Sequence, residues 1–344
     1  MTSPRHKPLI GCSSTPLVIA EIGVNHDGDP SIARDLIGAA AEHGADAVKF
    51  QFFNASRLLT SSATLAQYQA RTEADPVQML DRLELSSDQV LQLCDEAQQR
   101  GLSSIVTVFS PEDAAICADE RIDVIKIASP DLVNRPLIES CMEPGKPIIL
   151  STGASGLDEI RRTLQWMEPI RPSLLQCVSA YPVPIEQASL GGIGFLADAT
   201  GLVVGYSDHT MEVQTGAMAV LAGAMILEKH ITHSRAAHGP DHSMSLDPVR
   251  FGEYVRLARE AARILGPRDK HPLPIEQEVR LTCRQSVTMT RSLEQGAIIS
   301  HADLRVARPG TGIPAWELER LCGRRLAVRK NAGEILARED LVDA

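Results

Sequence analysis

The sequence contains no apolar run long enough to cross a membrane, and its N-terminal residues lead into no stretch that would serve as a signal peptide. We therefore expect a cytoplasmic protein without a membrane segment. An excess of basic residues is also missing, since the formal net charge is -10. Bulk charge thus gives no reason to expect binding to nucleic acid or to a membrane surface. Any binding of anions must come from a local arrangement of cations.

Paired cysteine motifs are absent as well. The seven cysteines are odd in number and scattered, and none stands in a CxxC spacing. This usage is typical of reduced, partly buried thiols in a cytoplasmic protein. No cysteine stands in a context that favours a nucleophile. The chain also shows no solenoid-type repeat and no low-complexity segment.

From residue 17 to about 265, short apolar runs alternate with segments of helical period. Eight runs are predicted strands: Leu17–Gly23, Ala47–Gln51, Ser103–Phe109, Val124–Ser129, Pro147–Thr152, Leu174–Ser179, Leu202–Ser207 and Met225–Ile231. Predicted helices close on a glycine at three places: Ser31–His43, Ser86–Arg100 and Asp247–Leu265. Eight strands alternating with helices predict an α/β protein with a (β/α)8 TIM barrel. A doubly wound open sheet is the alternative, because the sequence does not show closure.

The pattern changes after residue 265. Residues 266–279 are rich in proline and charge, which indicates a linker. Residues 280–344 then predict a separate, small, β-rich module. Its strand candidates are Ser286–Thr290, Ala297–Ser300 and Arg325–Val328, and Leu318–Leu321 suggests one helical turn. The predicted domains are therefore a barrel (1–265), a linker (266–279) and a small module (280–344).

Polar residues gather where the predicted strands end. In a parallel barrel, active residues collect at the carboxyl ends of the strands. Those ends supply Glu21, Asn25, Lys49, Gln51, Thr107, Phe109, Lys126, Ser129, Ser151, Thr152, Ser179, Tyr181, Ser207, His209, Glu228 and His230. Several neighbours in this set are two residues apart, so they share one face of a strand.

Two lysines, Lys49 and Lys126, interrupt otherwise apolar strands, where an ammonium group is costly unless it is paired. One interpretation is a pair of structural salt bridges with Glu21 and Glu228. A second is a phosphate or carboxylate held by both ammonium groups. The hydroxyls that could help to hold it are those of Thr107, Ser129, Ser151 and Ser207. A third is a Schiff base between one lysine and a keto acid, as in barrel aldolases.

Two histidines, His209 and His230, stand at the ends of consecutive predicted strands, separated by one helix-sized segment. Two imidazoles at neighbouring strand ends predict an open metal site completed by substrate oxygens and waters. Such a site suits an exchangeable ion such as Mn²⁺, with Mg²⁺ or Co²⁺ as alternatives, rather than a closed zinc centre. Four other histidines are interpreted as surface or hydrogen-bonded residues, namely His43, His233, His271 and His301.

Taken in order, these motifs resemble the sialic acid synthase family. The resemblance rests on Ala20–Gly28, Val48–Gln51, Lys126–Ser129, Ser151–Gly153, Ser207–Thr210, Glu228–His230 and Gly239–His242. The tail, with Arg308–Ile313 followed by Leu321–Arg324, resembles that family's C-terminal antifreeze-like (SAF, β-clip) domain. The resemblance covers nearly the whole chain from about residue 17.

The resemblance implies a reaction in which phosphoenolpyruvate (PEP) condenses with the open-chain aldehyde of an N-acylated hexosamine. The products are a nine-carbon 2-keto acid and phosphate. Positions matching His209 and His230 hold Mn²⁺ in the family, and Glu228 is a candidate for proton handling. Residues matching the PEP cradle are Lys49, Lys126, Thr107, Ser129, Ser151 and Ser207, with Gln51 beside them. Matching sugar contacts are Glu21, Tyr181 and Asp241, and Phe109 and Ser179 complete the predicted substrate-binding set.

The family is typically a domain-swapped dimer in which the antifreeze-like module caps the partner's barrel, and Arg308 matches an arginine that reaches the sugar's acyl group. Ser179 departs from the asparagine that is common in neuraminate-forming members. The acceptor therefore stays open between N-acetylmannosamine and a diacetamido-trideoxyhexose, the acceptor type of legionaminate and pseudaminate synthases. A Schiff-base pyruvate aldolase and a non-catalytic sugar-binding protein are the alternatives from other classes.

Overall fold

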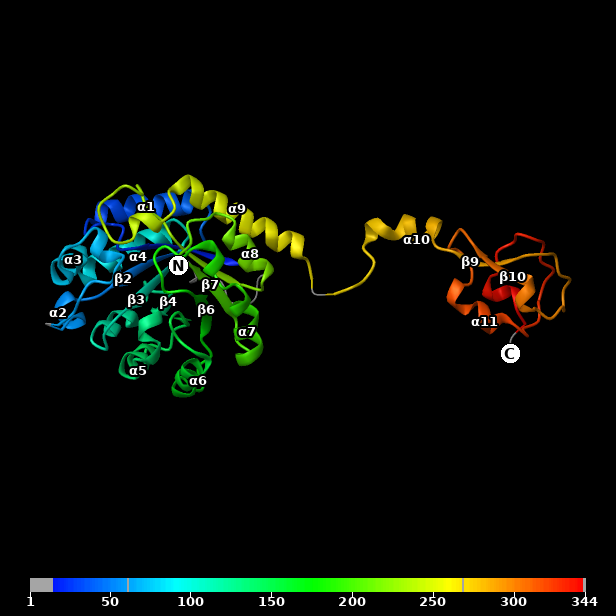
Figure 1. Ribbon diagram of the computed structural model, residues 1–344, viewed down its shortest axis with the longest axis horizontal. Helices are drawn as coiled ribbons and strands as arrows, with labels where there is room; N and C mark the ends of the chain where they lie inside the picture. Colours follow the sequence, from blue (N-terminus) through cyan, green and yellow to red (C-terminus); the bar gives the residue numbers. More distant parts are fainter. Residues whose placement is uncertain (1–14, 61, 268, 343–344) are drawn as a thin grey trace, which may run out of the picture. The chain divides into compact units, whose positions relative to one another are not determined.

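The computed structural model describes residues 15–60, 62–267 and 269–342. Eight parallel strands pair in chain order and close into a barrel, with helices outside it (Figure 1). The strands are β1 (Leu17–Gly23), β2 (Ala47–Phe52), β3 (Ser103–Val108), β4 (Val124–Ile127), β5 (Ile148–Ser151), β6 (Ser173–Cys177), β7 (Val204–Asp208) and β8 (Ile226–His230). The pairing of β1 with β8 closes the sheet, so the predicted TIM barrel is confirmed and the open sheet is excluded.

The helices of the barrel begin and end where local sequence signals place them. They are α1 (Pro30–Glu42), α2 (Ala55–Leu58), α3 (Pro76–Leu83), α4 (Ser87–Gln99), α5 (Arg135–Met142), α6 (Leu157–Trp166), α7 (Gly191–Thr200), α8 (Thr215–Leu221) and α9 (Pro248–Leu265). For example, α4 starts with a capping box between Ser86 and Gln89. It is followed by Gly101 at φ +79°, a backbone angle that favours glycine.

The barrel interior is built in two layers. The lower layer is apolar, and seven strands each contribute one side chain to it: Ile19, Ala47, Ile105, Val124, Ile149, Leu175 and Ile226. The eighth strand contributes Gly205, where an added Cβ would lie 2.6 Å from the Cβ of Ile226. Because side chains alternate along a strand, the residue two positions further on each strand faces the same interior. That next layer is polar and forms the floor of the site described below.

The connection from β2 to α4 is long and carries its own small apolar cluster. Buried members are Val24, Phe53, Met79 and Leu83, and partly buried ones include Leu58, Leu80 and Phe109. The sequence analysis did not predict the helices α2 and α3 of this connection, and residues of both line the cavity at the barrel mouth.

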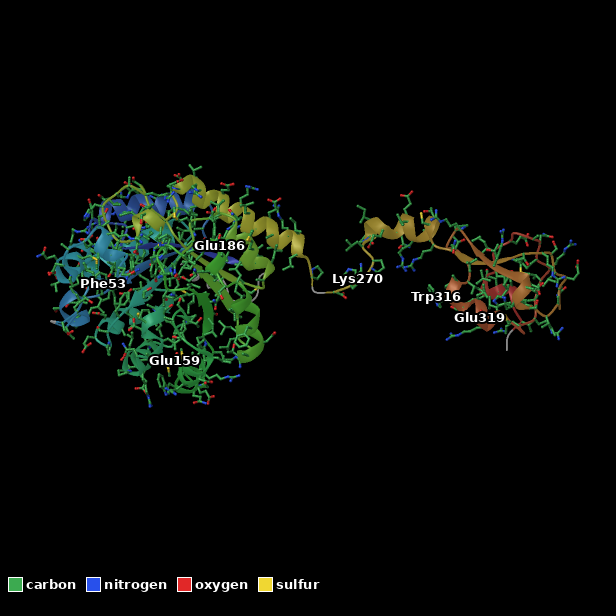
Figure 2. All side chains as sticks on the ribbon, viewed as in Figure 1. Phe53, Glu159, Glu186, Lys270, Trp316 and Glu319 are labelled. Atoms are coloured by element: carbon green, nitrogen blue, oxygen red, sulfur yellow. The ribbon has the colours of Figure 1, made fainter. Side chains whose placement is uncertain are left out.

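Residues from Pro267 onward form a second compact unit. It contains α10 (Gln277–Cys283), α11 (Leu318–Leu321) and an antiparallel pair, β9 (Ser286–Met289) and β10 (Leu304–Ala307). Its apolar core includes Val287, Leu326 and Leu336, whereas Trp316 is 73% exposed (Figure 2). The boundary between the two compact units lies at Gly266, whereas the predicted boundary between barrel and linker lies after residue 265.

Two strand predictions in this second unit were wrong. Ala297–Ser300 and Arg325–Val328 form no strand, because they meet through a single isolated bridge between Ile298 and Arg325. The partner that pairs with β9 over four residues is β10, which the sequence analysis missed. Across the described part of the chain, no helix is long and apolar enough to span a membrane.

Candidate active site

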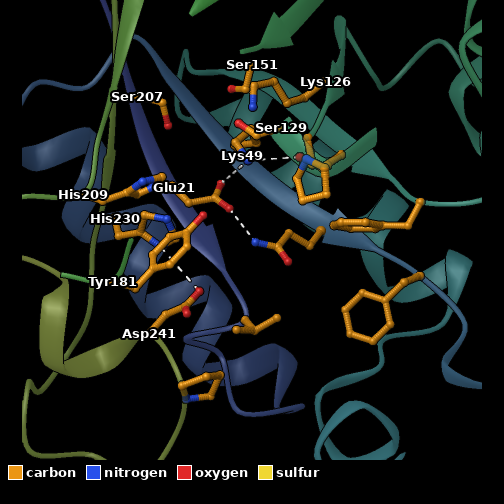
Figure 3. A pocket seen from close by; sticks show the side chains of 18 of the residues that line it. Glu21, Lys49, Lys126, Ser129, Ser151, Tyr181, Ser207, His209, His230 and Asp241 are labelled. Atoms are coloured by element: carbon orange, nitrogen blue, oxygen red, sulfur yellow. Dashed lines mark hydrogen bonds and ion pairs between the residues drawn. The ribbon is translucent and has the colours of Figure 1, made fainter. Parts of the chain in front are cut away.

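A cavity of about 250 Å³ opens at the carboxyl ends of the barrel strands (Figure 3). Its floor is the polar layer that stands directly above the apolar one. Each strand contributes one residue to that layer: Glu21, Lys49, Thr107, Lys126, Ser151, Cys177, Ser207 and Glu228. The step of two residues from an apolar side chain to this layer is found on seven strands, and on β7 Gly205 takes the lower position. The layer lies at the carboxyl ends of the strands, where active residues of parallel barrels collect.

Two ammonium groups and two carboxyl groups face one another on this floor. Lys49 Nζ lies 3.0 Å from Glu21 Oε2 and 3.8 Å from Glu228 Oε2, and it donates to Thr107 Oγ1 at 3.0 Å. Lys126 Nζ has a longer contact, 3.6 Å to Glu228 Oε2. Both lysines are 3% exposed. Salt bridges with Glu21 and Glu228 are therefore present, but Lys126 has fewer contacts than Lys49.

Burial and mutual attraction set the protonation of this group. Burial raises the pKa of Glu21, and the Glu228 carboxylate adds to this effect. Burial also lowers the pKa of Lys126. For Lys49, burial acts in the same direction, but the carboxylates of Glu21 and Glu228 outweigh it and raise the pKa. Lys49 therefore stays charged, while Lys126 releases its proton more readily than an ordinary lysine.

The two predicted metal-binding histidines lie side by side at the rim. The ring centroids of His209 and His230 are 5.5 Å apart, and both side chains are buried. His209 Nδ1 is 3.0 Å from the carbonyl oxygen of Val178; an Nδ1–H that donates there leaves the Nε2 lone pair free. Burial, reinforced by His209, lowers the pKa of His230 and favours its neutral, ligating form.

These donors fit a divalent cation with open coordination positions. Among the residues that the structure describes, buried His230 Nδ1 has no hydrogen-bond partner, and it lies 3.6 Å from Asp241 Oδ2. Burial, with a contribution from Glu21, raises the pKa of Asp241 to about 7. Within the described residues no group of three or more His, Cys, Asp or Glu side chains is arranged as a metal cage. Two imidazoles would thus bind the ion, and further ligands would come from substrate or water.

One wall of the cavity is aromatic and apolar. The Tyr181 ring packs against His209 at 4.3 Å between centroids, and Tyr68 packs against Tyr181 at 4.7 Å. Beside them the connection between β2 and α4 supplies apolar lining residues: Phe53, Leu58, Met79, Leu80 and Leu83. Sequence reasoning missed this wall and Tyr68. The spacing of Met79, Leu80 and Leu83 on one helical face is the signal that could have indicated it.

The structure brings most predicted site residues to this one cavity. Its lining includes Glu21, Lys49, Gln51, Thr107, Phe109, Lys126, Ser129, Ser151, Tyr181, Ser207, His209, Glu228, His230 and Asp241. Ser179 differs: its side chain is exposed and lines a neighbouring groove with Thr152 and Ser189. The floor position that β6 supplies is Cys177, which the sequence analysis did not select. Arg308 is exposed in the second unit.

Comparisons with known proteins agree with the predicted resemblance. The NeuB family matches residues 36–270, and the SAF domain matches residues 284–342. The chain is 37% identical to the N,N'-diacetyllegionaminic acid synthase of Legionella pneumophila, with 96% of each chain covered. It is 34% identical to the Campylobacter jejuni protein of that name, over 94% of this chain and 99% of the relative.

A solved structure adds the same likeness in three dimensions. The N-acetylneuraminic acid (sialic acid) synthetase of Leptospira borgpetersenii, in complex with citrate, is 29% identical. It superposes with a TM-score of 0.70 over 77% of this chain and 90% of that one. The sequence families, the relatives and the fold point the same way, and the chain belongs to the NeuB family, with a SAF domain at its C-terminal end.

Proposed function

We propose that this protein is a PEP-dependent nonulosonate synthase. C3 of PEP forms a bond to the aldehyde carbon of an open-chain N-acylated amino sugar, water adds at C2, and the C2–O bond to phosphate breaks. The products are a nine-carbon 2-keto acid and inorganic phosphate. The observation that carries the proposal is one cavity holding two buried ammonium groups and a pair of neighbouring imidazoles. The synthase names of the relatives support it.

The floor of the cavity would bind PEP. Lys126 contacts one carboxylate at 3.6 Å, so its ammonium group can turn toward a phosphate or carboxylate. Ser151 Oγ is buried without a hydrogen-bond partner in the described residues, which supplies a donor for the same anion. Lys49 is held by Glu21 and Thr107 and adds positive potential beneath the site. Glu228, between both lysines, is placed to hold or pass on a proton.

The rim would hold the divalent ion through His209 and His230. When bound, such an ion supplies Lewis-acid polarisation of the aldehyde oxygen. We propose Mn²⁺ as the ion, following the resemblance. The chain's own contribution is to keep the His209 imidazole fixed, because the carbonyl oxygen of Val178 and the ring of Tyr181 hold it in place.

The apolar wall favours an acceptor that carries methyl and acetamido groups. Among the residues that line the barrel cavity, the cations other than histidine are the two floor lysines, so the cavity wall supplies no further cation for a sugar phosphate. Phe53, Met79 and Leu83 would instead contact the methyl groups of a 2,4-diacetamido-trideoxyhexose. We therefore propose this acceptor over N-acetylmannosamine. The names of the Legionella and Campylobacter relatives support that choice.

An acceptor screen tests the proposal. The full-length protein is incubated with PEP, Mn²⁺ and either the diacetamido-trideoxyhexose, N-acetylmannosamine or its 6-phosphate. Released phosphate is measured, and the keto-acid product is identified by its mass in a mass spectrometer. We expect kcat/KM to be highest for the diacetamido sugar. Equal or better turnover of N-acetylmannosamine would contradict the acceptor assignment, and no phosphate release from any sugar would contradict the reaction.

A Schiff-base aldolase is the second candidate. Burial lowers the pKa of Lys126, and a lowered pKa activates a lysine amine as a nucleophile toward a keto acid. Borohydride added with pyruvate distinguishes the two. The synthase proposal predicts no covalent adduct on Lys49 or Lys126 and a loss of turnover with chelator. A trapped lysine together with chelator-resistant activity would favour the aldolase.

The assembly and the compartment are also proposals. We propose a domain-swapped dimer in which the SAF domain of one chain caps the barrel of the other, with Arg308 facing the acceptor. Exclusion of water from the reacting groups would be the benefit. We propose a cytoplasmic location, which is supported by free rather than disulfide-bonded cysteines among the described residues.

A further inference from the structure

The outer face of the barrel carries an ion pair that the proposed chemistry does not use. Lys229 Nζ of β8 lies 3.2 Å from Asp208 Oδ1 of β7, and both side chains are 0% exposed. Alternation along the strands points them away from the cavity, toward the helical layer. The other barrel-strand side chains described on that face are uncharged. Buried charges are costly, so this pair calls for an explanation.

The pair is fully supplied with polar partners. Asp208 Oδ1 accepts hydrogen bonds from the backbone N–H and the hydroxyl of Thr210, at 2.9 and 2.8 Å. Asp208 Oδ2 accepts from Thr215 Oγ1 at 2.5 Å. Lys229 Nζ donates to the carbonyl oxygen of Thr210 at 2.5 Å. The arrangement is therefore a built network, in which every contact converges on Asp208 and Thr210.

The residues of this network are sequence neighbours of the two proposed metal ligands. Asp208 and Thr210 flank His209, and Lys229 precedes His230. Asp208 and Lys229 are also register partners in the β7–β8 ladder. One ion pair thus fixes the backbone on both sides of the first imidazole and ties it to the residue before the second.

The helical layer closes over the pair. The Tyr254 ring of α9 lies 5.6 Å from Lys229 Nζ and is itself fully buried. Gly216 of α8 makes room for that ring, since an added Cβ would lie 2.5 Å from a ring carbon of Tyr254. The pair is therefore enclosed by α8, α9 and the strands, with neither side chain exposed.

We propose that Asp208 and Lys229 are positioning residues that hold His209 and His230 at the spacing needed to bind one divalent cation. The inference rests on the proposed metal-dependent function of that site. Neither residue reaches the cavity, so the pair acts through the backbone of the two histidines. A buried ion pair is often no more stable than an apolar pair of similar volume. A requirement for stability alone therefore does not explain its presence.

The test separates positioning from stability. The variant Asp208→Leu with Lys229→Met replaces the pair by apolar side chains of comparable size. Full-length protein stripped with chelator is titrated with Mn²⁺ by calorimetry, and its thermal midpoint is measured without metal. We expect a folded protein whose Mn²⁺ affinity falls by about 10-fold or more, the range typical of groups that orient ligands. PEP affinity without metal should stay within about 2-fold. Wild-type Mn²⁺ affinity in the folded variant would overturn the proposal.

Three further variants make the result decisive. Leu227→Val changes packing on the same face of β8 and should leave Mn²⁺ affinity at the wild-type value; an equal loss there would attribute the effect to packing and overturn the proposal. If the apolar pair does not fold, Asp208→Asn with Lys229→Gln is judged by the same criterion. His209→Ala separates a failure of the proposed metal site from a failure of the positioning role. Unchanged Mn²⁺ binding in His209→Ala would refute the metal site itself, whereas lost binding there and normal binding in the paired variant would refute positioning alone.

Discussion

Removing the Lys126 ammonium group is the perturbation that most directly examines the anion site. In Lys126→Met, Glu228 keeps Lys49 at 3.8 Å and still accepts from Ser207 Oγ at 2.9 Å. No carboxylate is left without a partner, and a cation that is costly to bury is removed. We therefore expect the free energy of unfolding to change by less than ~2 kcal/mol.

The effect on PEP should be much larger. A hydrogen bond to a charged group contributes about 1.5–3 kcal/mol, which corresponds to roughly a 10- to 100-fold change in binding. Because Lys126 has one ion-pair contact of 3.6 Å and lies on the cavity floor, its loss should raise the KM for PEP by that factor. The KM for the acceptor should stay within about 2-fold, since the acceptor is expected to contact the apolar wall rather than the floor.

The assay is steady-state phosphate release with each substrate varied in turn. Lys49→Met serves as the matched comparison, because it leaves buried Glu21 with Gln51 at 2.9 Å as its remaining side-chain partner. That variant should lose about 3 kcal/mol of stability, as expected when one partner of a buried pair is removed. Equal increases in both KM values for Lys126→Met, or equal losses of stability for the two variants, would refute the assignment of roles.

Three further predictions concern packing, pH and the second unit. Gly205→Ala should destabilise the barrel by about 1–3 kcal/mol, because the new methyl would lie 2.6 Å from Ile226 Cβ; an unchanged urea midpoint would contradict this. Burial lowers the pKa of His26 to about 4, below its unfolded value of about 6.5. As the pH falls, the unfolded state therefore takes up this proton at a higher pH than the folded state does. Stability is thus complete above pH 6.5 and falls by ~3 kcal/mol as the pH drops to 4; His26→Gln should show a smaller fall, and an identical pH profile would argue against it. Arg308→Ala should raise the KM of the acceptor and not that of PEP, and unchanged kinetics would count against a capping SAF domain.

The barrel was predictable because its local signals agree. Predicted and observed bounds coincide for β1, and the starts of β2, β3 and β4 match as well. Glycines after α1 and α4 mark the helix ends. The second unit was harder, because beyond the β9–β10 pair its backbone is joined by isolated bridges that leave no run of alternating residues, as between Ile298 and Arg325.

The site was predictable where chemistry follows strand parity. Lys49, Thr107, Lys126 and Glu228 reached one floor because each stands two residues beyond an apolar interior residue. The apolar wall was not predictable in this way. Met79 and Leu83 belong to a long connection, and only the tertiary fold brings that connection to the barrel mouth.

Ser179 and Cys177 show the limit of extending a strand by parity. β6 ends at Cys177, so the position two residues later has already left the interior and is exposed. The Asp208–Lys229 pair was not predicted, for another reason. Charged residues beside histidines at strand ends are expected to line the cavity. Because side chains alternate along a strand, Asp208 and Lys229 instead lie on the outer face of the barrel.

The most direct test is the anomalous diffraction signal of Mn²⁺ in crystals of the full-length protein grown with PEP. We expect one peak bonded to the imidazoles of both His209 and His230, with PEP density in contact with Lys126 on the floor below. A peak at another place, with the two imidazoles unligated, or PEP bound away from the lysines, would contradict the account.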